Sequence, residues 1–66
     1  MERNFRLDWQ ALVTEAVRRR KEQGLTQHEL ALFTGISKPT VNNFEQGKTK
    51  ISVENALKIL HALGLS

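Results

Sequence analysis

The chain has 66 residues, enough for one small domain with a single hydrophobic core. It contains no cysteine, which excludes a disulfide framework and a thiolate metal site and fits a cytoplasmic protein. Ten basic side chains against seven acidic ones give a net charge of +3, which favours an anionic partner. No apolar run approaches the roughly 20 residues of a membrane-spanning helix, and no signal-like segment opens the chain.

Residues 1–7 show no helical periodicity, and we expect them to form a flexible N-terminal arm ahead of one domain over residues 8–66. From Asp8 onward, apolar residues recur at spacings of three and four, which predicts an amphipathic helix capped by Asp8. The helix is expected to end near Gln23, because Gly24 follows. Its apolar positions are Trp9, Leu12, Val13, Ala16 and Val17.

Thr26 and Glu29 have the spacing of a capping box, which predicts a second helix over residues 27–34. Leu25 and Leu30 occupy the two positions of a hydrophobic staple, and Gly35 ends the helix.

Ser37 is expected to cap a third helix over residues 38–46, in which Pro39 in the first turn costs no intrahelical hydrogen bond. Gly47 ends it, and Ser52 caps a fourth helix that Gly64 ends. No stretch alternates with period two, so the sequence predicts an all-α fold. The apolar stripe of the fourth helix is Val53, Ala56, Leu57, Leu60 and Leu63.

Two short helices joined by a glycine-containing turn describe a helix-turn-helix, here residues 27–46. The run LTQHELALFTGISKPTVNNFEQGKTK resembles the Cro/repressor (XRE-like) helix-turn-helix family of bacterial and phage DNA-binding proteins. The resemblance covers about residues 16–64 and implies a compact four- to five-helix bundle, a lambda-repressor-like DNA-binding domain. It makes residues 38–46 the recognition helix.

Two charged residues lie on apolar helix faces. Arg20 falls in the middle of the first apolar stripe, and Glu45 lies on the same side of the third helix as Phe44. Because a charge buried alone is very costly, we infer a partly buried ion pair between Arg20 and Glu45. The family commonly has such a pair at the matching positions.

The other side of the third helix is polar, which for an arbitrary small protein indicates only a solvated surface. The resemblance favours DNA recognition instead, because Asn and Gln amides and Lys match base edges in the major groove. Pro39 cannot donate a hydrogen bond, but it can pack on a thymine methyl group. The base-reading positions that the resemblance implies are Lys38, Pro39, Asn42 and Asn43.

Phosphate contacts are expected from the start of the second helix, where backbone amides favour anions, and from the loop after the third helix. Thr40 can reach either a base or a phosphate. The residues assigned to phosphate are Thr26, Gln27, Thr40, Gln46, Lys48, Thr49 and Lys50.

The other basic residues are weaker candidates for contacts with DNA. Arg18 lies close in sequence to Glu15 and Glu22, so its cluster is expected to be a solvated face. Arg3 and Arg6 of the arm can enter a minor groove, but simple disorder is the plainer interpretation.

The resemblance implies sequence-specific binding of double-stranded DNA by a transcriptional regulator, expected to be a repressor. Two alternatives stay open. The motifs NFEQGK and LKILHALGLS are similar to those of antitoxins, which bind their own promoter and hold a toxin protein. The domain can also be a protein-interaction module without DNA binding.

We expect neither an enzyme nor a cofactor or metal site. The carboxylates are scattered and the serines serve as caps, which leaves no activated catalytic group. His28 and His61 have no second ligand at a spacing useful for metal binding.

Relatives in the family often form homodimers through a fifth helix or a C-terminal strand. Here the sequence stops at Ser66, which can cap such a helix. We therefore expect either a weak homodimer on DNA, formed through the fourth helix and the arm, or a minimal form of a longer relative.

Overall fold

The computed structural model describes residues 8–65, which contain four α-helices and no strand. The expected all-α fold is confirmed. The third helix ends one residue earlier than expected, with Gln46 as its C-cap. The arm, residues 1–7, and Ser66 lie outside the described residues. The helices are α1 (Trp9–Glu22), α2 (Gln27–Thr34), α3 (Lys38–Glu45) and α4 (Val53–Ala62).

Each helix begins at the cap expected from the sequence, because a side-chain oxygen there accepts a hydrogen bond from a backbone N–H in the first turn. The N-terminal cap of α2 is the most complete of the four, because Thr26 and Glu29 exchange two hydrogen bonds. Thr26 Oγ1 accepts from the Glu29 N–H at 3.0 Å, and Glu29 Oε1 accepts from the Thr26 N–H at 2.9 Å. The four cap residues are Asp8, Thr26, Ser37 and Ser52.

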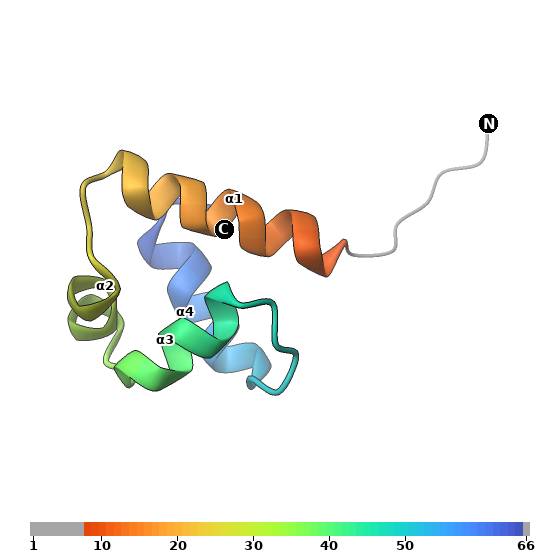
Figure 1. Cartoon of the computed structure of the whole chain (residues 1–66). Coiled ribbons are helices and arrows are strands. Elements are labelled where there is room, and N and C mark those ends of the chain that lie inside the picture. The colour runs from red at the N-terminus through yellow and green to blue at the C-terminus, as the bar shows by residue number, and fades with distance from the viewer. Residues whose placement is uncertain (1–7, 66) are drawn as a thin grey trace.

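Figure 1 shows α1 along one side of the molecule, with α2 and α3 joined by a short turn and α4 passing behind them. α2 packs against both α3 and α4, and α1 packs against α3. Gly35 makes the turn between α2 and α3 with a φ of 73°, and its N–H donates to the Ala31 carbonyl at 2.9 Å. Because other residues rarely adopt this backbone conformation, a glycine here sets the angle between the two helices.

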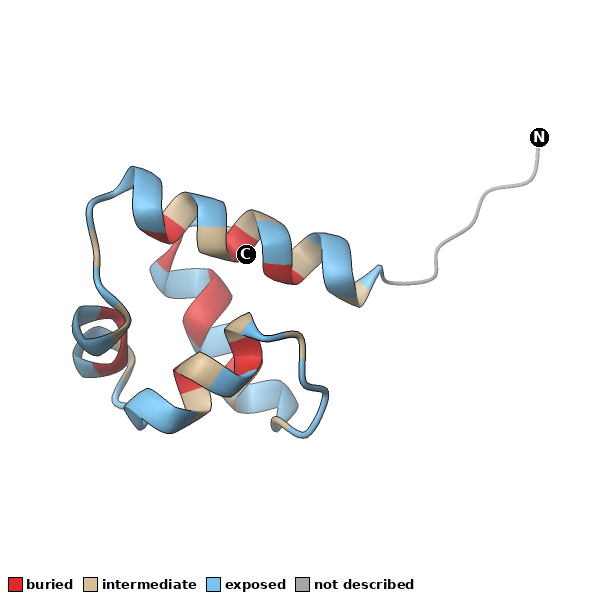
Figure 2. Ribbon diagram, in the orientation of Figure 1, coloured by how far each residue is buried: buried red, intermediate tan, exposed pale blue. Residues whose placement is uncertain are grey.

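The core lies where the helices meet, and buried residues face inward from every helix (Figure 2). Trp9 closes one end of the core. Its ring meets that of Phe44 edge-on, with centroids 5.6 Å apart, and its Nε1 donates to the Gly47 carbonyl at 3.1 Å. The largest fully buried side chains are Phe44, Leu30, Ile59, Leu63, Val13 and Val41.

The apolar stripe expected along the fourth helix belongs only partly to the core. Ile59 is fully buried, whereas Val53 is 75% exposed and Leu57 is 50% exposed. Val53 and Leu57 are one turn apart and share one flank of α4. The face that packs against the other helices is instead formed by Ala56, Ile59, Leu60 and Leu63.

None of the helices between residues 8 and 65 is long and apolar enough to cross a membrane.

Candidate nucleic-acid interface

An ion pair between Arg20 and Glu45 joins α1 to α3, as the sequence indicated. Arg20 Nε donates to Glu45 Oε2 at 2.6 Å, and Nη2 donates to Oε1 at 3.0 Å. A third donor, Nη1, reaches the Leu25 carbonyl at 2.8 Å. The two side chains are only 11% and 7% exposed, so the pair is shielded from water. It holds α3, α1 and the loop before α2 in one fixed arrangement.

Gln27 adds a hydrogen bond that the sequence did not indicate. Its Nε2 donates to Glu45 Oε1 at 2.9 Å, so the Glu45 carboxylate is shared between Arg20 and Gln27. The contact links the first residue of α2 to the last residue of α3. Gln27 therefore has a structural contact besides its expected role at phosphate, and that role stays a prediction.

The side of α3 that points away from the core carries the four side chains assigned to base reading. Lys38, Pro39 and Asn43 are exposed, and Asn42 is half-buried. Lys38, Pro39 and Asn42 line a shallow hollow together with Gln27 of α2. The fold thus brings residues from both helices of the helix-turn-helix to one surface.

Asn43 lies next to the loop that follows α3. Lys48 Nζ donates to Asn43 Oδ1 at 3.4 Å, so a residue assigned to bases contacts one assigned to phosphate. The loop is fixed by backbone hydrogen bonds, from the Lys48 N–H to the Asn43 carbonyl at 3.1 Å and from the Gly47 N–H to the Phe44 carbonyl at 2.9 Å. The other assigned residues here, Gln46, Thr49 and Lys50, are exposed.

Two of the three threonines assigned to phosphate, Thr26 and Thr40, take part in helix caps. The Thr26 hydroxyl accepts from the Glu29 N–H, which leaves its own O–H free to donate. Thr40 is half-buried, and its hydroxyl shares a hydrogen bond with Ser37 Oγ at 2.8 Å. Thr26 is thus the more available donor of the two.

Three of the four arginines and lysines of α1 are paired with carboxylates, whereas Lys21 and the lysines around α3 form no ion pair within residues 8–65. Arg18 of α1 forms ion pairs with Glu15 and Glu22, and its hydrogen bond holds the pKa of the Glu15 carboxyl below the usual range. In contrast, the three lysines of α3 and the following loop form no ion pair with a carboxylate of residues 8–65. These are Lys38, Lys48 and Lys50.

The described residues offer no group of three His, Cys, Asp or Glu side chains that could hold a metal ion.

Sequence reasoning missed the hydrogen bonds of Gln27 and Trp9, which cross 18 and 38 residues of chain. For Trp9 a signal existed, because a half-buried indole N–H normally finds an acceptor. For Gln27 the sequence held no such signal.

The helix-turn-helix family model, HTH_3, matches residues 18–66. An uncharacterized HTH-type transcriptional regulator of Haemophilus influenzae is 33% identical over 54 residues, which cover 82% of this chain and 55% of that protein. The antitoxin HipB of Escherichia coli O6:H1 is 43% identical over 47 residues, which cover 71% of this chain and 50% of that protein. The chain thus spans about half the length of these curated relatives.

Proposed function

The chain belongs to the Cro/repressor-type helix-turn-helix family, and on this premise we propose that it binds double-stranded DNA in a sequence-specific manner as a transcriptional regulator, with α3 in the major groove. The observation that carries the proposal is the surface shared by α2 and α3, where Gln27, Lys38, Pro39 and Asn42 line one hollow. A helix about 10–12 Å across fits a major groove about 12 Å wide.

Four side chains of α3 are proposed to contact bases. The amides of Asn42 and Asn43 can donate and accept at once, which suits the N6 and N7 edge of adenine. Lys38 can donate to guanine, and Pro39 can pack on a thymine methyl group. All four side chains have some exposed surface, as this role requires.

A second set is proposed to contact the DNA backbone. Thr26 and Gln27 lie at the N-terminus of α2, where backbone N–H groups favour phosphate. Lys48 and Lys50 supply positive charge that is not neutralised by a carboxylate of the described residues. Such contacts give affinity and register that fall as salt rises. Thr40, Gln46 and Thr49 complete the set.

The first test is selection from a random duplex library at near-physiological salt, followed by sequencing of the bound pool. We expect an enriched site built of half-sites about one DNA turn, or 10 base pairs, apart. An unenriched pool, with binding that disappears as salt rises, would refute sequence-specific reading. It would favour the alternative of a protein-interaction module.

Substitutions then separate the two sets of contacts. Asn43→Ala is expected to cost about 1–3 kcal/mol on the selected site and to relax the preference at one base pair. Lys48→Ala is expected to weaken all duplexes alike and to lower the slope of log affinity against log salt by about 1. Because Lys48 contacts Asn43, Lys50→Ala is the matched control that removes a charge without touching that amide. Uniform weakening by Asn43→Ala would show that Asn43 reads no base.

An antitoxin is the second candidate, supported by the likeness to the antitoxin HipB. In this role the chain would bind its own promoter and also hold a toxin protein. Co-purification of the product of an adjacent gene with the tagged protein would support it. Normal operator binding with no co-purifying protein would favour the simple repressor.

The family and the names of the relatives point to a non-enzymatic DNA-binding protein. We further propose that it works in the cytoplasm, where it can reach bacterial or phage DNA, and that it binds as a homodimer. A dimer matches a site made of two half-sites.

A further inference from the structure

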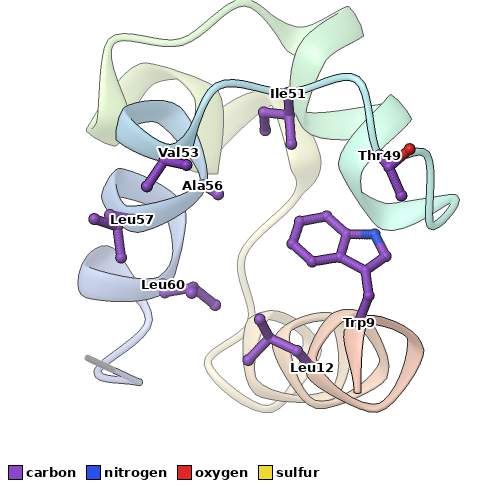
Figure 3. Close-up of a pocket in the computed structure, with 8 residues that line it drawn as sticks. All are labelled: Trp9, Leu12, Thr49, Ile51, Val53, Ala56, Leu57 and Leu60. Atoms are coloured by element: carbon purple, nitrogen blue, oxygen red, sulfur yellow. The ribbon is translucent and has the colours of Figure 1, made fainter. Parts of the chain in front are cut away.

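A groove with a volume of about 370 Å³ lies between α1, the loop from α3 to α4, and α4. Figure 3 shows side chains from all three elements around one open space. Among them are Trp9 and Leu12 of α1, Thr49 and Ile51 of the loop, and Val53 and Leu57 of α4.

The lining is almost entirely apolar. Thr49 is its one polar side chain apart from the Trp9 indole, whose N–H already donates to the Gly47 carbonyl. No charged side chain lines the groove. Its α4 side is open to solvent, since Val53 is 75% exposed and Leu57 is 50% exposed. An apolar occupant would remove this surface from water, whereas a charged group would lose its hydration without gaining a partner.

The starts of α2, α3 and α4 show how the chain enters a helix in this fold. In each, an apolar residue directly before the N-cap is at least half-buried against the core, and the fourth residue of the helix is buried. These are the two positions of the hydrophobic staple, which fixes the direction from which the chain enters the helix. The pairs are Leu25 with Leu30, Ile36 with Val41, and Ile51 with Ala56.

α1 has apolar residues at the same two positions. Its N-cap is Asp8, so Leu7 precedes the cap and Leu12 is the fourth residue of the helix. Leu12 is half-buried, packs against the core and lines the groove. Because the other three helices follow the staple pattern, we expect Leu7 to pack on Leu12. The chain would then reach α1 from the side of the groove.

Phe5 lies two residues before Leu7 and is the only aromatic residue of the arm. In an extended segment, side chains two positions apart point to the same side, so Phe5 would face the groove together with Leu7, and Arg6 would face solvent. The chain from Phe5 to Asp8 can span about 10 Å. This reach is comparable with the separation of about 8–10 Å between the axes of packed helices, so the Phe5 ring can reach the α4 side of the groove.

From these observations we propose that the groove is occupied by the N-terminal arm of the same chain. Leu7 packs on Leu12, and the Phe5 ring lies in the groove against Leu57. The arm is tethered at the rim of the groove, since α1 begins with the lining residue Trp9. So short a tether gives an effective concentration on the order of millimolar, which a separate molecule must exceed to take the groove. This inference concerns the free chain and does not depend on DNA binding.

Urea unfolding followed by circular dichroism compares two alanine substitutions in the arm. Phe5→Ala is expected to raise the equilibrium constant of unfolding about tenfold, because it removes an aromatic ring from the groove. Arg6→Ala is the matched control, one residue along the chain, and is expected to change that constant less than about twofold. Equal effects of the two substitutions would overturn the proposal.

A double-substitution cycle tests whether Phe5 lies against α4. In the Leu57→Ala background, the effect of Phe5→Ala on the unfolding constant is expected to shrink at least about twofold, because the two side chains share a contact. Leu32→Ala is the control background, since Leu32 is 68% exposed but lies on α2 and outside the groove. There Phe5→Ala is expected to keep its full effect. The same effect in both backgrounds would contradict docking in the groove.

Nuclear Overhauser contacts in the unaltered chain test the docked arm without any substitution. We expect contacts between the ring protons of Phe5 and the methyl groups of Leu57. They decide the question even if Phe5→Ala loses its helical circular dichroism, and their absence would overturn the proposal.

Acrylamide quenching of Trp9, the chain's only tryptophan, separates the arm from a second copy as the occupant of the groove. It is measured from micromolar to millimolar concentration of the whole chain. We expect quenching that is constant over this range, stronger in Phe5→Ala and unchanged in Arg6→Ala. Quenching that weakens as the protein concentration rises would place a second copy in the groove and refute the arm as its occupant. Equal quenching in the two variants would refute it as well.

Discussion

Replacing Glu45 with alanine tests how the recognition helix is held. The substitution removes the acceptor for two donors of Arg20, whose side chain is only 11% exposed, and for the Gln27 amide. Arg20 keeps its hydrogen bond to the Leu25 carbonyl. The guanidinium group would therefore stay largely buried with two of its donor positions unpaired.

The expected loss in the free energy of unfolding is large for a domain of this size. Removing one partner of a buried ion pair typically costs about 3–5 kcal/mol, and the remaining bond to Leu25 favours the lower end of that range. A chain of 66 residues has a total stability of only about 3–10 kcal/mol. A loss of about 3 kcal/mol corresponds to a fall in melting temperature of about 12–24 °C.

Thermal and urea unfolding, followed by circular dichroism at the helix band, measures the effect. Glu22→Ala is the control, because Glu22 pairs with Arg18 at 3.2 Å but is 60% exposed, and its loss is expected to cost less than about 0.5 kcal/mol. The double substitution Arg20→Met with Glu45→Leu is expected to regain at least half of the loss, since no charge is then left buried. Equal melting temperatures for Glu45→Ala and Glu22→Ala would refute the reasoning.

Three further substitutions probe local features, each measured by urea unfolding. Gly35→Ala is expected to cost about 1–2 kcal/mol from its φ of 73° alone, because an added Cβ would meet nothing within 4 Å; no loss would mean that the turn relaxes. Trp9→Phe removes the hydrogen bond to Gly47 and part of the ring that packs against Phe44, at a cost of at least about 1 kcal/mol, and an unchanged stability would show that neither contributes. Thr26→Ala should cost about 1 kcal/mol and Thr26→Ser almost nothing; equal losses would argue against the capping role of the hydroxyl.

Local chemistry in the sequence determined the helices. Ser, Thr and Asp side chains bond backbone groups within three residues, and glycine supplies positive φ, so the ends of helices depend on near neighbours. The ends of α3 and α4 each differ from the expected ends by a single residue. The motifs around Gly35 also identified the family correctly.

The ion pair could be inferred because helical periodicity placed Arg20 and Glu45 on apolar faces. A charge in such a place needs a partner, and these two were the candidates of opposite sign. The assignments of base and phosphate contacts on α3 and its loop do not follow from helical periodicity. They derive from resemblance to the family and remain predictions for the DNA-binding experiments.

The tertiary structure alone decided which parts of each apolar face are covered. Periodicity put Val53 and Leu57 on the apolar side of α4, but the packing of α4 against the rest of the fold buries Ile59 and leaves these two side chains exposed. The hydrogen bonds from Gln27 to Glu45 and from Trp9 to Gly47 also join residues far apart in the chain. Sequence patterns report on residues within a few positions of one another, whereas these contacts and the groove beside α4 depend on how whole helices pack.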